Sequence, residues 1–284
     1  MRHVANRWLL LSWALVLGAS CGDDGPTGST EGAGGTGAAA STSIGAGAST
    51  SSGGMKPPPG PSADGWVSSF EPDAGATGCA AEPVDFEAAG AAAVTVGDST
   101  IYVAFEQIGD NQNPVVARFD GGVAVWCAVH ETEGPDGRAL GVTWDGGDHA
   151  YVVYTVVGGG TSLEGKGGWL ASYAPGAISG GGSKVSYIGR VATADGALAS
   201  GTFVIAVKSD NKVNSHGPAG AVNVLGSGEV EFFGASAHKP IDADGASSMD
   251  CTDYPFDSRY RFSADLASFV CADCSNCVSQ TPCP

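Results

Sequence analysis

Positive charge is the scarcest feature of this sequence. The chain has 13 Lys and Arg against 30 Asp and Glu, which gives a formal net charge of −17. A surface of that sign repels phosphate backbones and anionic lipid headgroups. The composition therefore argues against nucleic acid as a partner, and against electrostatic attraction to a membrane surface.

Long apolar runs are also missing. The run from Trp8 to Leu17 is shorter than the roughly 20 residues that cross a bilayer core. It follows the basic residues Arg2 and Arg7 and leads into Gly18-Ala19-Ser20. This order of basic, apolar and small segments predicts a secretory signal peptide over residues 1–20. We therefore expect an exported protein.

The small residues lead directly into Cys21. Leu17-Gly18-Ala19-Ser20-Cys21 resembles the lipobox of bacterial lipoproteins, although the family has Leu three residues before the Cys, where this chain has Gly18. The resemblance implies cleavage before Cys21, acylation of that residue, and a membrane anchor on the periplasmic side or at the cell surface. An ordinary signal peptidase would also accept Gly-Ala-Ser, and would release a soluble secreted protein.

The segment after Cys21 has almost no large apolar residue. Residues 21–64 are dominated by Gly, Ser, Thr, Ala and Pro, so they cannot bury enough surface to offset the entropy of ordering. We expect a disordered tether there, followed by a β domain over 65–250 and a Cys-rich C-terminal tail, 251–284, packed on that domain.

Helical periodicity is nearly absent from residue 65 onward. Gly, at 45 residues in the chain, separates short runs of Val, Ile, Tyr, Phe, Thr and Trp, which is typical of strands and turns. The sequence therefore predicts an all-β fold. The expected strands are 93–96, 100–105, 114–119, 123–129, 140–144, 150–157, 169–173, 184–191, 201–207, 221–225, 229–233 and 260–263, the last continued by 268–270.

A strand, a Gly/Asp turn and a second strand recur along the chain. The pattern covers 94–105, 142–154 and 222–233, and the first two copies are offset by 48 residues, near the roughly 40–50 residues of a propeller blade. The domain resembles bacterial β-propeller repeat proteins, which implies four or five blades, complete or incomplete; the alternative is a β-sandwich.

Seven cysteines follow Cys21, and an exported chain passes through a compartment that oxidises thiols. We expect disulfides among them, with a connectivity that the sequence leaves open. The run from Cys271 to Cys283 also resembles the bacterial ferredoxin pattern, but has five residues before the last Cys where the family has three. The disulfide candidates are Cys79, Cys127, Cys251, Cys271, Cys274, Cys277 and Cys283.

Catalytic and ligand motifs are weak. Asp242, Asp244 and Asp250 form a candidate calcium turn, but the acids that an EF-hand needs on either side are missing. Residues 160–166 fit the start of a phosphate-binding loop without its Ser or Thr, so we expect no nucleotide. No catalytic set and no cofactor is predicted. His149 and His216, in Gly- and Asn-rich surroundings, are expected to be solvated.

These observations favour a non-enzymatic extracytoplasmic domain that binds or scaffolds an unknown extracellular or periplasmic ligand. The alternative is an extracytoplasmic hydrolase acting on polysaccharide or peptide, because one fold supports both kinds of function. A third possibility is an electron carrier that uses the C-terminal cysteines.

Overall fold

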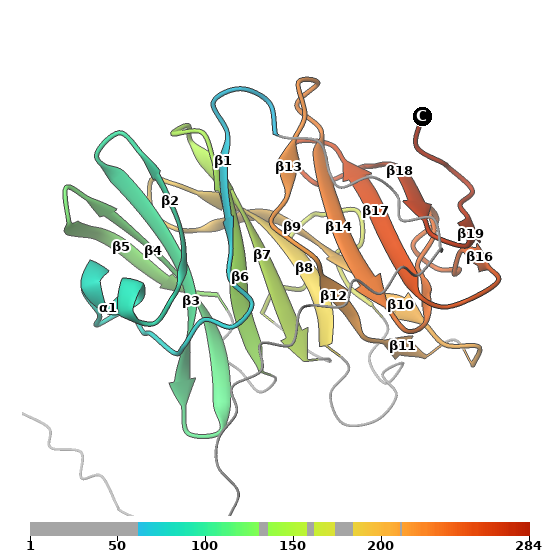
Figure 1. Cartoon of the computed structure of the whole chain (residues 1–284), viewed down its shortest axis with the longest axis horizontal. Coiled ribbons are helices and arrows are strands. Elements are labelled where there is room, and N and C mark those ends of the chain that lie inside the picture. Colours follow the sequence, from blue (N-terminus) through green and yellow to red (C-terminus); the bar gives the residue numbers. More distant parts are fainter. Residues whose placement is uncertain (1–61, 131–135, 158–161, 174–183, 211) are drawn as a thin grey trace, which may run out of the picture. The chain divides into compact units, whose positions relative to one another are not determined.

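The computed structural model describes residues 62–284, except 131–135, 158–161, 174–183 and 211 (Figure 1). Within these ranges the chain forms antiparallel sheets and one short helix, none of the sheets closing on itself. The all-β prediction is confirmed. The predicted signal, Cys21 and the tether up to residue 61 lie outside the described residues.

The first large sheet lies between the other two (Figure 1). Its strands pair in the order β1-β6-β7-β8-β9, all antiparallel. Because both faces of the sheet are covered, its strands read as continuous apolar runs rather than alternating ones, and Ala150 to Tyr154 are all buried. The strands are β1 (Val67–Phe70), β6 (Gly137–Trp144), β7 (His149–Val157), β8 (Lys184–Ala192) and β9 (Leu198–Val204).

The second sheet packs its inner face on β6 and carries the helix on its outer face. Helix α1 (Pro83–Ala88) buries Phe86 against Tyr102 and Phe119, with ring centroids 5.1 and 5.9 Å from its own. The helix begins with Pro at its first turn and a capping box between Glu82 and Asp85. The strands, in pairing order, are β2 (Ala92–Val96), β3 (Ser99–Ile108), β4 (Asn111–Asp120) and β5 (Val123–Val129).

The third large sheet pairs in the order β12-β14-β17-β18, with β13 also on β14. Strand β17 alternates between buried and more exposed residues: Tyr260 and Phe262 are buried, while the half-buried Arg261 pairs with the buried Glu231 at 2.9 Å. The strands are β12 (His216–Pro218), β13 (Asn223–Val224), β14 (Val230–Ser236), β17 (Phe256–Phe262) and β18 (Phe269–Cys274).

Two small sheets complete the described fold. One has the order β11-β10-β15, with β10, which directly follows β9, at its centre. The other pairs β16 with β19 near the C-terminus. Their bounds are β10 (Ala206–Val207), β11 (Val213–Asn214), β15 (Lys239–Pro240), β16 (Asp250–Cys251) and β19 (Cys277–Val278).

Most predicted strands are present, and one is not. Segment 123–129 coincides with β5, and the Gly-containing turns at 97–98, 120–122, 145–148 and 226–228 each connect two paired strands. The strand predicted over 169–173 is wrong. There the Leu170 N–H donates to Thr202 Oγ1, and the Phe203 N–H donates to the Leu170 carbonyl, so these residues dock on β9 without forming a ladder.

Gly201 and Gly234 are among the glycines that close packing requires. A Cβ at Gly201, on β9, would collide with the Tyr187 hydroxyl, and a Cβ at Gly234, on β14, would collide with the His216 ring. Both positions let an aromatic or imidazole ring cross from one strand to its neighbour in a core that has no spare volume.

Candidate functional site

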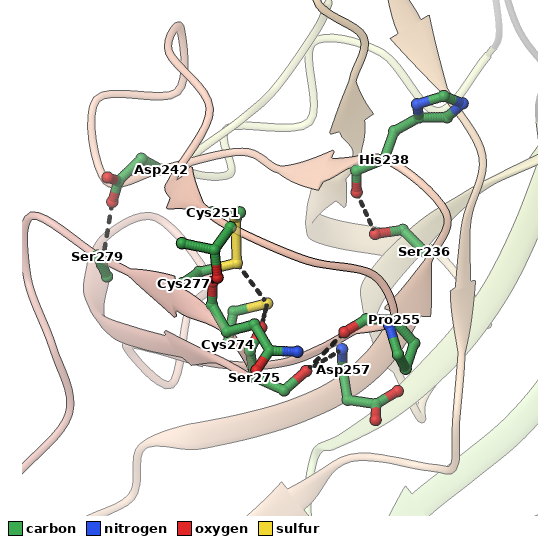
Figure 2. Close-up of a disulfide and its surroundings, with 12 residues drawn as sticks. Ser236, His238, Asp242, Cys251, Pro255, Asp257, Cys274, Ser275, Cys277 and Ser279 are labelled. Atoms are coloured by element: carbon green, nitrogen blue, oxygen red, sulfur yellow. Dashed lines mark hydrogen bonds between the residues drawn. A yellow bond between two sulfur atoms is a disulfide. The ribbon is translucent and has the colours of Figure 1, made fainter. Parts of the chain in front are cut away.

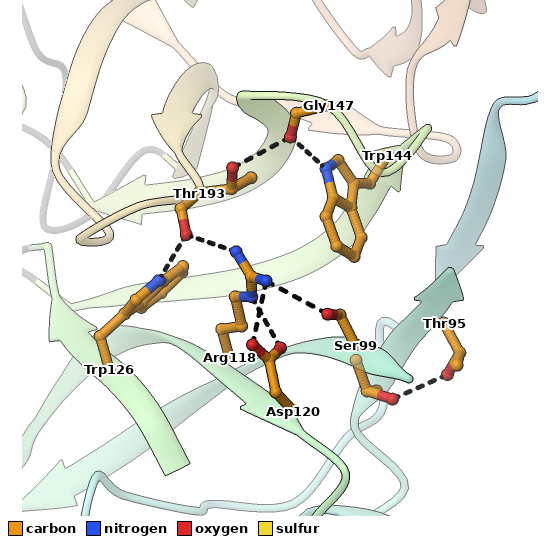
Figure 3. A network of polar contacts seen from close by, with 9 residues as sticks. Thr95, Ser99, Arg118, Asp120, Trp126, Trp144, Gly147 and Thr193 are labelled. Carbon is orange, nitrogen blue, oxygen red and sulfur yellow. Dashed lines mark hydrogen bonds and ion pairs between the residues drawn. The ribbon is translucent and has the colours of Figure 1, made fainter. Parts of the chain in front are cut away.

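Arg118 is the centre of a polar network between the first two sheets (Figure 3). Its guanidinium donates to Asp120 Oδ1 (3.0 Å), Asp120 Oδ2 (3.1 Å), Ser99 Oγ (3.1 Å) and the Thr193 carbonyl (2.9 Å). The group also lies over the Trp144 ring, 5.6 Å from its centroid. The Arg118 guanidinium donates four hydrogen bonds to groups within the domain. Its role is therefore to join the two sheets rather than to bind an anionic ligand.

The neighbours of Arg118 complete the same junction. Trp126 Nε1 donates to the Thr193 carbonyl at 2.7 Å, and both Trp144 Nε1 and Thr193 Oγ1 donate to the Gly147 carbonyl at 2.9 Å. A hydrogen bond from Ser99, followed by the Arg118 interaction, lowers the pKa of Asp120. Both tryptophans pack on the core: Trp144 is 2% exposed, and Trp126 is partly buried.

A second polar group, Ser186, His216 and Ser258, joins the first and third sheets in the core. His216 Nδ1 lies 3.2 Å from Ser186 Oγ, and His216 Nε2 lies 2.8 Å from Ser258 Oγ. The prediction that His216 is solvated is wrong: its exposed fraction is 0%. Its polar sequence neighbours misled the prediction, because β12 turns the imidazole inward between β8 and β17.

Each serine hydroxyl beside His216 has a second hydrogen-bond partner. Ser186 Oγ lies 2.8 Å from the His216 carbonyl oxygen, and Ser258 Oγ lies 3.2 Å from the Gly234 carbonyl oxygen. Burial lowers the pKa of His216 to about 3, so the ring is neutral. A serine hydroxyl within hydrogen-bond distance of an imidazole nitrogen is the geometry of a nucleophile and its base. Here both side chains are enclosed, so a substrate has no path to them.

His130, directly after β5, also has both ring nitrogens hydrogen-bonded within the domain. Its Nε2 donates to the Gly196 carbonyl at 2.8 Å, and its Nδ1 accepts from the Tyr154 hydroxyl at 2.7 Å. Burial lowers the pKa of His130. His149 is half-buried at the start of β7 and accepts from Arg190 at 3.0 Å, so it too is held by a side chain rather than only by solvent.

The predicted calcium turn is held by hydrogen bonds of its own. Asp242 is 2% exposed and accepts from Ser279 Oγ at 3.0 Å (Figure 2). It also accepts from the Gln280 N–H, at 3.1 and 3.2 Å. Asp244 accepts from the Ser247 hydroxyl and from the N–H groups of residues 246 and 247, which lowers its pKa. Asp250, on β16, is exposed. Asp242 thus anchors the C-terminal segment to the loop, whereas Asp244 holds the turn of the loop itself.

Three disulfides are present among the described cysteines. Cys79–Cys127 ties the segment before α1 to β5, Cys251–Cys277 joins β16 to β19, and Cys271–Cys283 closes the C-terminus onto β18. The expectation of disulfides is confirmed, and the ferredoxin-like run is divided between two of them. The Sγ of Cys274 lies 3.1 Å from that of Cys277.

The other motifs of the sequence do not converge. Ser236 Oγ donates to the backbone carbonyl of His238, not to its ring. The acids Glu131 and Glu133 and residues 160–161 of the loop lie outside the described residues. Trp169 contacts Phe269 with centroids 5.0 Å apart, as part of the core rather than as an exposed platform.

No family model, curated protein sequence or solved structure matches this chain. In the part that the structure describes, no helix is long and apolar enough to cross a membrane.

Proposed function

We propose that the chain is an exported bacterial lipoprotein, anchored through Cys21, whose β domain binds or scaffolds a partner outside the cytoplasm. The observation that carries the proposal is the set of three disulfides within the domain. Disulfides persist in oxidising compartments and are rare in the cytosol. They agree with the export signal predicted over residues 1–20, which is an independent feature of the sequence.

We also propose that the three large sheets are propeller-like blades. Their support is the sequence repeat: 94–105 falls on the β2–β3 hairpin, 142–154 on β6–β7, and 222–233 on β13–β14. In each sheet this hairpin is followed by two more antiparallel strands. A rigid stack of repeated sheets with apolar interfaces suits a scaffold better than a domain that must open and close.

A binding role is favoured over catalysis by the state of the polar side chains. Arg118, His130 and His216 each have the hydrogen-bonding groups of their side chains engaged by other parts of the domain. The Ser258–His216 pair is the specific observation on the side of a hydrolase. A serine-reactive fluorophosphonate probe separates the two: we expect no labelling of Ser258 in the folded protein, and labelling lost in Ser258→Ala would favour the hydrolase.

Detergent-phase partition of the expressed full chain tests the anchor. We expect the wild type in the detergent phase of the membrane fraction, and its matched Cys21→Ser variant outside that phase. A wild-type chain that is exported but stays in the aqueous phase would overturn lipidation and leave export standing. A chain found in the cytoplasm with reduced cysteines would overturn the whole proposal.

A further inference from the structure

Three cysteine sulfurs lie together beside the C-terminus (Figure 2). Cys251 on β16 and Cys277 on β19 face each other in register and form a disulfide, and Cys274 ends β18 next to them. The three Sγ atoms all lie within 4.8 Å of one another. The cluster is thus one disulfide with a further cysteine sulfur in contact with it.

The contact between Cys274 and Cys277 is direct. Cys277 Sγ carries no thiol proton, because it belongs to the disulfide, and Cys274 Sγ donates to the Ser275 carbonyl at 3.3 Å. At 3.1 Å the two sulfurs are closer than the roughly 3.5–4.0 Å at which non-bonded carbon atoms rest. A sulfur lone pair of Cys274 is therefore adjacent to the sulfur that a thiolate would attack.

The turn that places Cys274 is firmly held. The Ser275 N–H donates to the Asp257 carbonyl at 2.8 Å, the Asp257 N–H donates to Ser275 Oγ at 2.9 Å, and Ser275 Oγ donates to the Pro255 carbonyl at 3.0 Å. Asn276 completes the turn with a φ of 59°. Hydrogen bonds on both sides of the serine thus fix the backbone beside Cys274, so the sulfur contact belongs to a built arrangement.

We propose that Cys251, Cys274 and Cys277 form a thiol–disulfide exchange site in which Cys274 is the attacking thiol. Cys274 loses its proton to water, and its thiolate attacks Cys277 Sγ. The Cys274–Cys277 bond forms, the Cys251–Cys277 bond breaks, and the Cys251 thiolate leaves and takes up a proton. One disulfide and one thiol are present before and after, so the step needs no oxidant and no reductant.

The two pairings tie the C-terminal segment to different strands. In the first, β19 is bonded covalently to β16; in the second, it is bonded to the end of β18, and β16 is held by hydrogen bonds alone. Cys274 and Cys277 are half-buried, whereas Cys251 is 7% exposed. The attack therefore starts from the accessible side of the cluster, and the released thiol lies on the inner side.

Metal binding by the same three sulfurs is less favoured than exchange, because it needs an additional reduction step. Zinc and other thiophilic metals bind thiolates, so two electrons would first have to reduce the Cys251–Cys277 disulfide. Exchange uses the oxidation state that is present, which also makes it independent of whether Cys21 carries a lipid.

Alkylation mapping of the purified full-length mature protein tests the site. Trypsin cuts after Lys212, Arg259 and Arg261 but not before Pro240, so Cys251 lies in peptide 213–259 and the other two cysteines in 262–284. The protein is incubated without reductant, denatured in excess iodoacetamide so that a buried thiol is labelled as well as an accessible one, and digested. We expect label on Cys274 at first, with the two peptides linked, and a time-dependent label on Cys251 as peptide 213–259 separates.

The matched variant is Cys274→Ser, which removes the attacking sulfur and keeps a small polar side chain. We expect complete loss of the Cys251 label and permanently linked peptides in this variant. The proposal is overturned if wild-type protein carries label only on Cys274 throughout the incubation. It is also overturned if Cys251 is labelled equally in Cys274→Ser. Label on an unlipidated Cys21 falls in a third peptide, so failure of the anchor is distinguished from failure of the exchange.

Discussion

Acidification from pH 7.5 to 5.0 should destabilise this domain chiefly through His216. The ring is fully buried, and burial lowers its pKa from 6.5 to about 3. Below pH 6.5 the imidazole is protonated in the unfolded chain but stays neutral in the folded chain. The contribution of His216 to the free energy of unfolding is therefore fully present above pH 6.5, and it is lost as the pH falls toward the folded-state pKa of about 3. Each pH unit in that window costs about 1.4 kcal/mol, which gives about 2 kcal/mol at pH 5.0.

The pH window separates His216 from the carboxylates. Asp120, Asp210, Asp244 and Asp265 have pKa values lowered from 3.8, so their contribution is lost only as the pH falls below that value. At pH 5.0 these groups remain ionised in both states. His130, whose pKa burial also lowers, acts in the same direction as His216.

Urea denaturation at both pH values, with all disulfides intact, measures the effect. The comparison is with His216→Gln, which keeps a polar side chain but does not titrate. We expect the wild type to lose about 2 kcal/mol more free energy of unfolding than the variant between the two pH values. An equal loss in wild type and His216→Gln would refute the reasoning.

Three further perturbations have defined outcomes in thermal or urea denaturation. Gly201→Ala forces a methyl group into a tyrosine hydroxyl and should cost about 1–3 kcal/mol, whereas Gly226→Ala, which meets no atom within 4 Å, should change little. Arg118→Ala removes charge-assisted bonds between two sheets and should cost about 2 kcal/mol, while Lys212→Ala, at an exposed ion pair, should leave the midpoint unchanged. Cys79→Ser opens the disulfide that spans 48 residues and should cost about 2–5 kcal/mol; a midpoint equal to the wild type would contradict its role.

The strands could be predicted because the physics that forms them is local. Strand β5 could be predicted because its residues include several valines, which favour strands. The turns could be predicted because glycine readily adopts a positive φ, as Gly97 (61°) and Gly146 (89°) do. Helix α1 was not predicted, although Pro83 and the Glu82–Asp85 capping box mark its start, because six residues give too little periodicity. The short strands β10, β11 and β15 exist only through their pairing, which no local pattern reveals.

The polar sites could not be predicted because they are made by distant residues. Ser186, His216 and Ser258 come from three strands, and nothing near His216 in the sequence indicates burial. Strand 169–173 was predicted from local residue type and alternation, but the segment packs onto β9 through single hydrogen bonds and forms no ladder. Disulfide connectivity is likewise set by the fold: of the cysteines in the C-terminal run, Cys277 pairs back to β16 and Cys271 pairs forward to Cys283.

Intact mass spectrometry of the protein isolated from its membrane fraction, before and after reduction, tests the central claim most directly. The account predicts a chain that begins at Cys21, carries acyl groups, and gains two hydrogens on reduction for each of its three disulfides. A chain that begins at Met1, carries no acyl mass and keeps the same mass on reduction would contradict it.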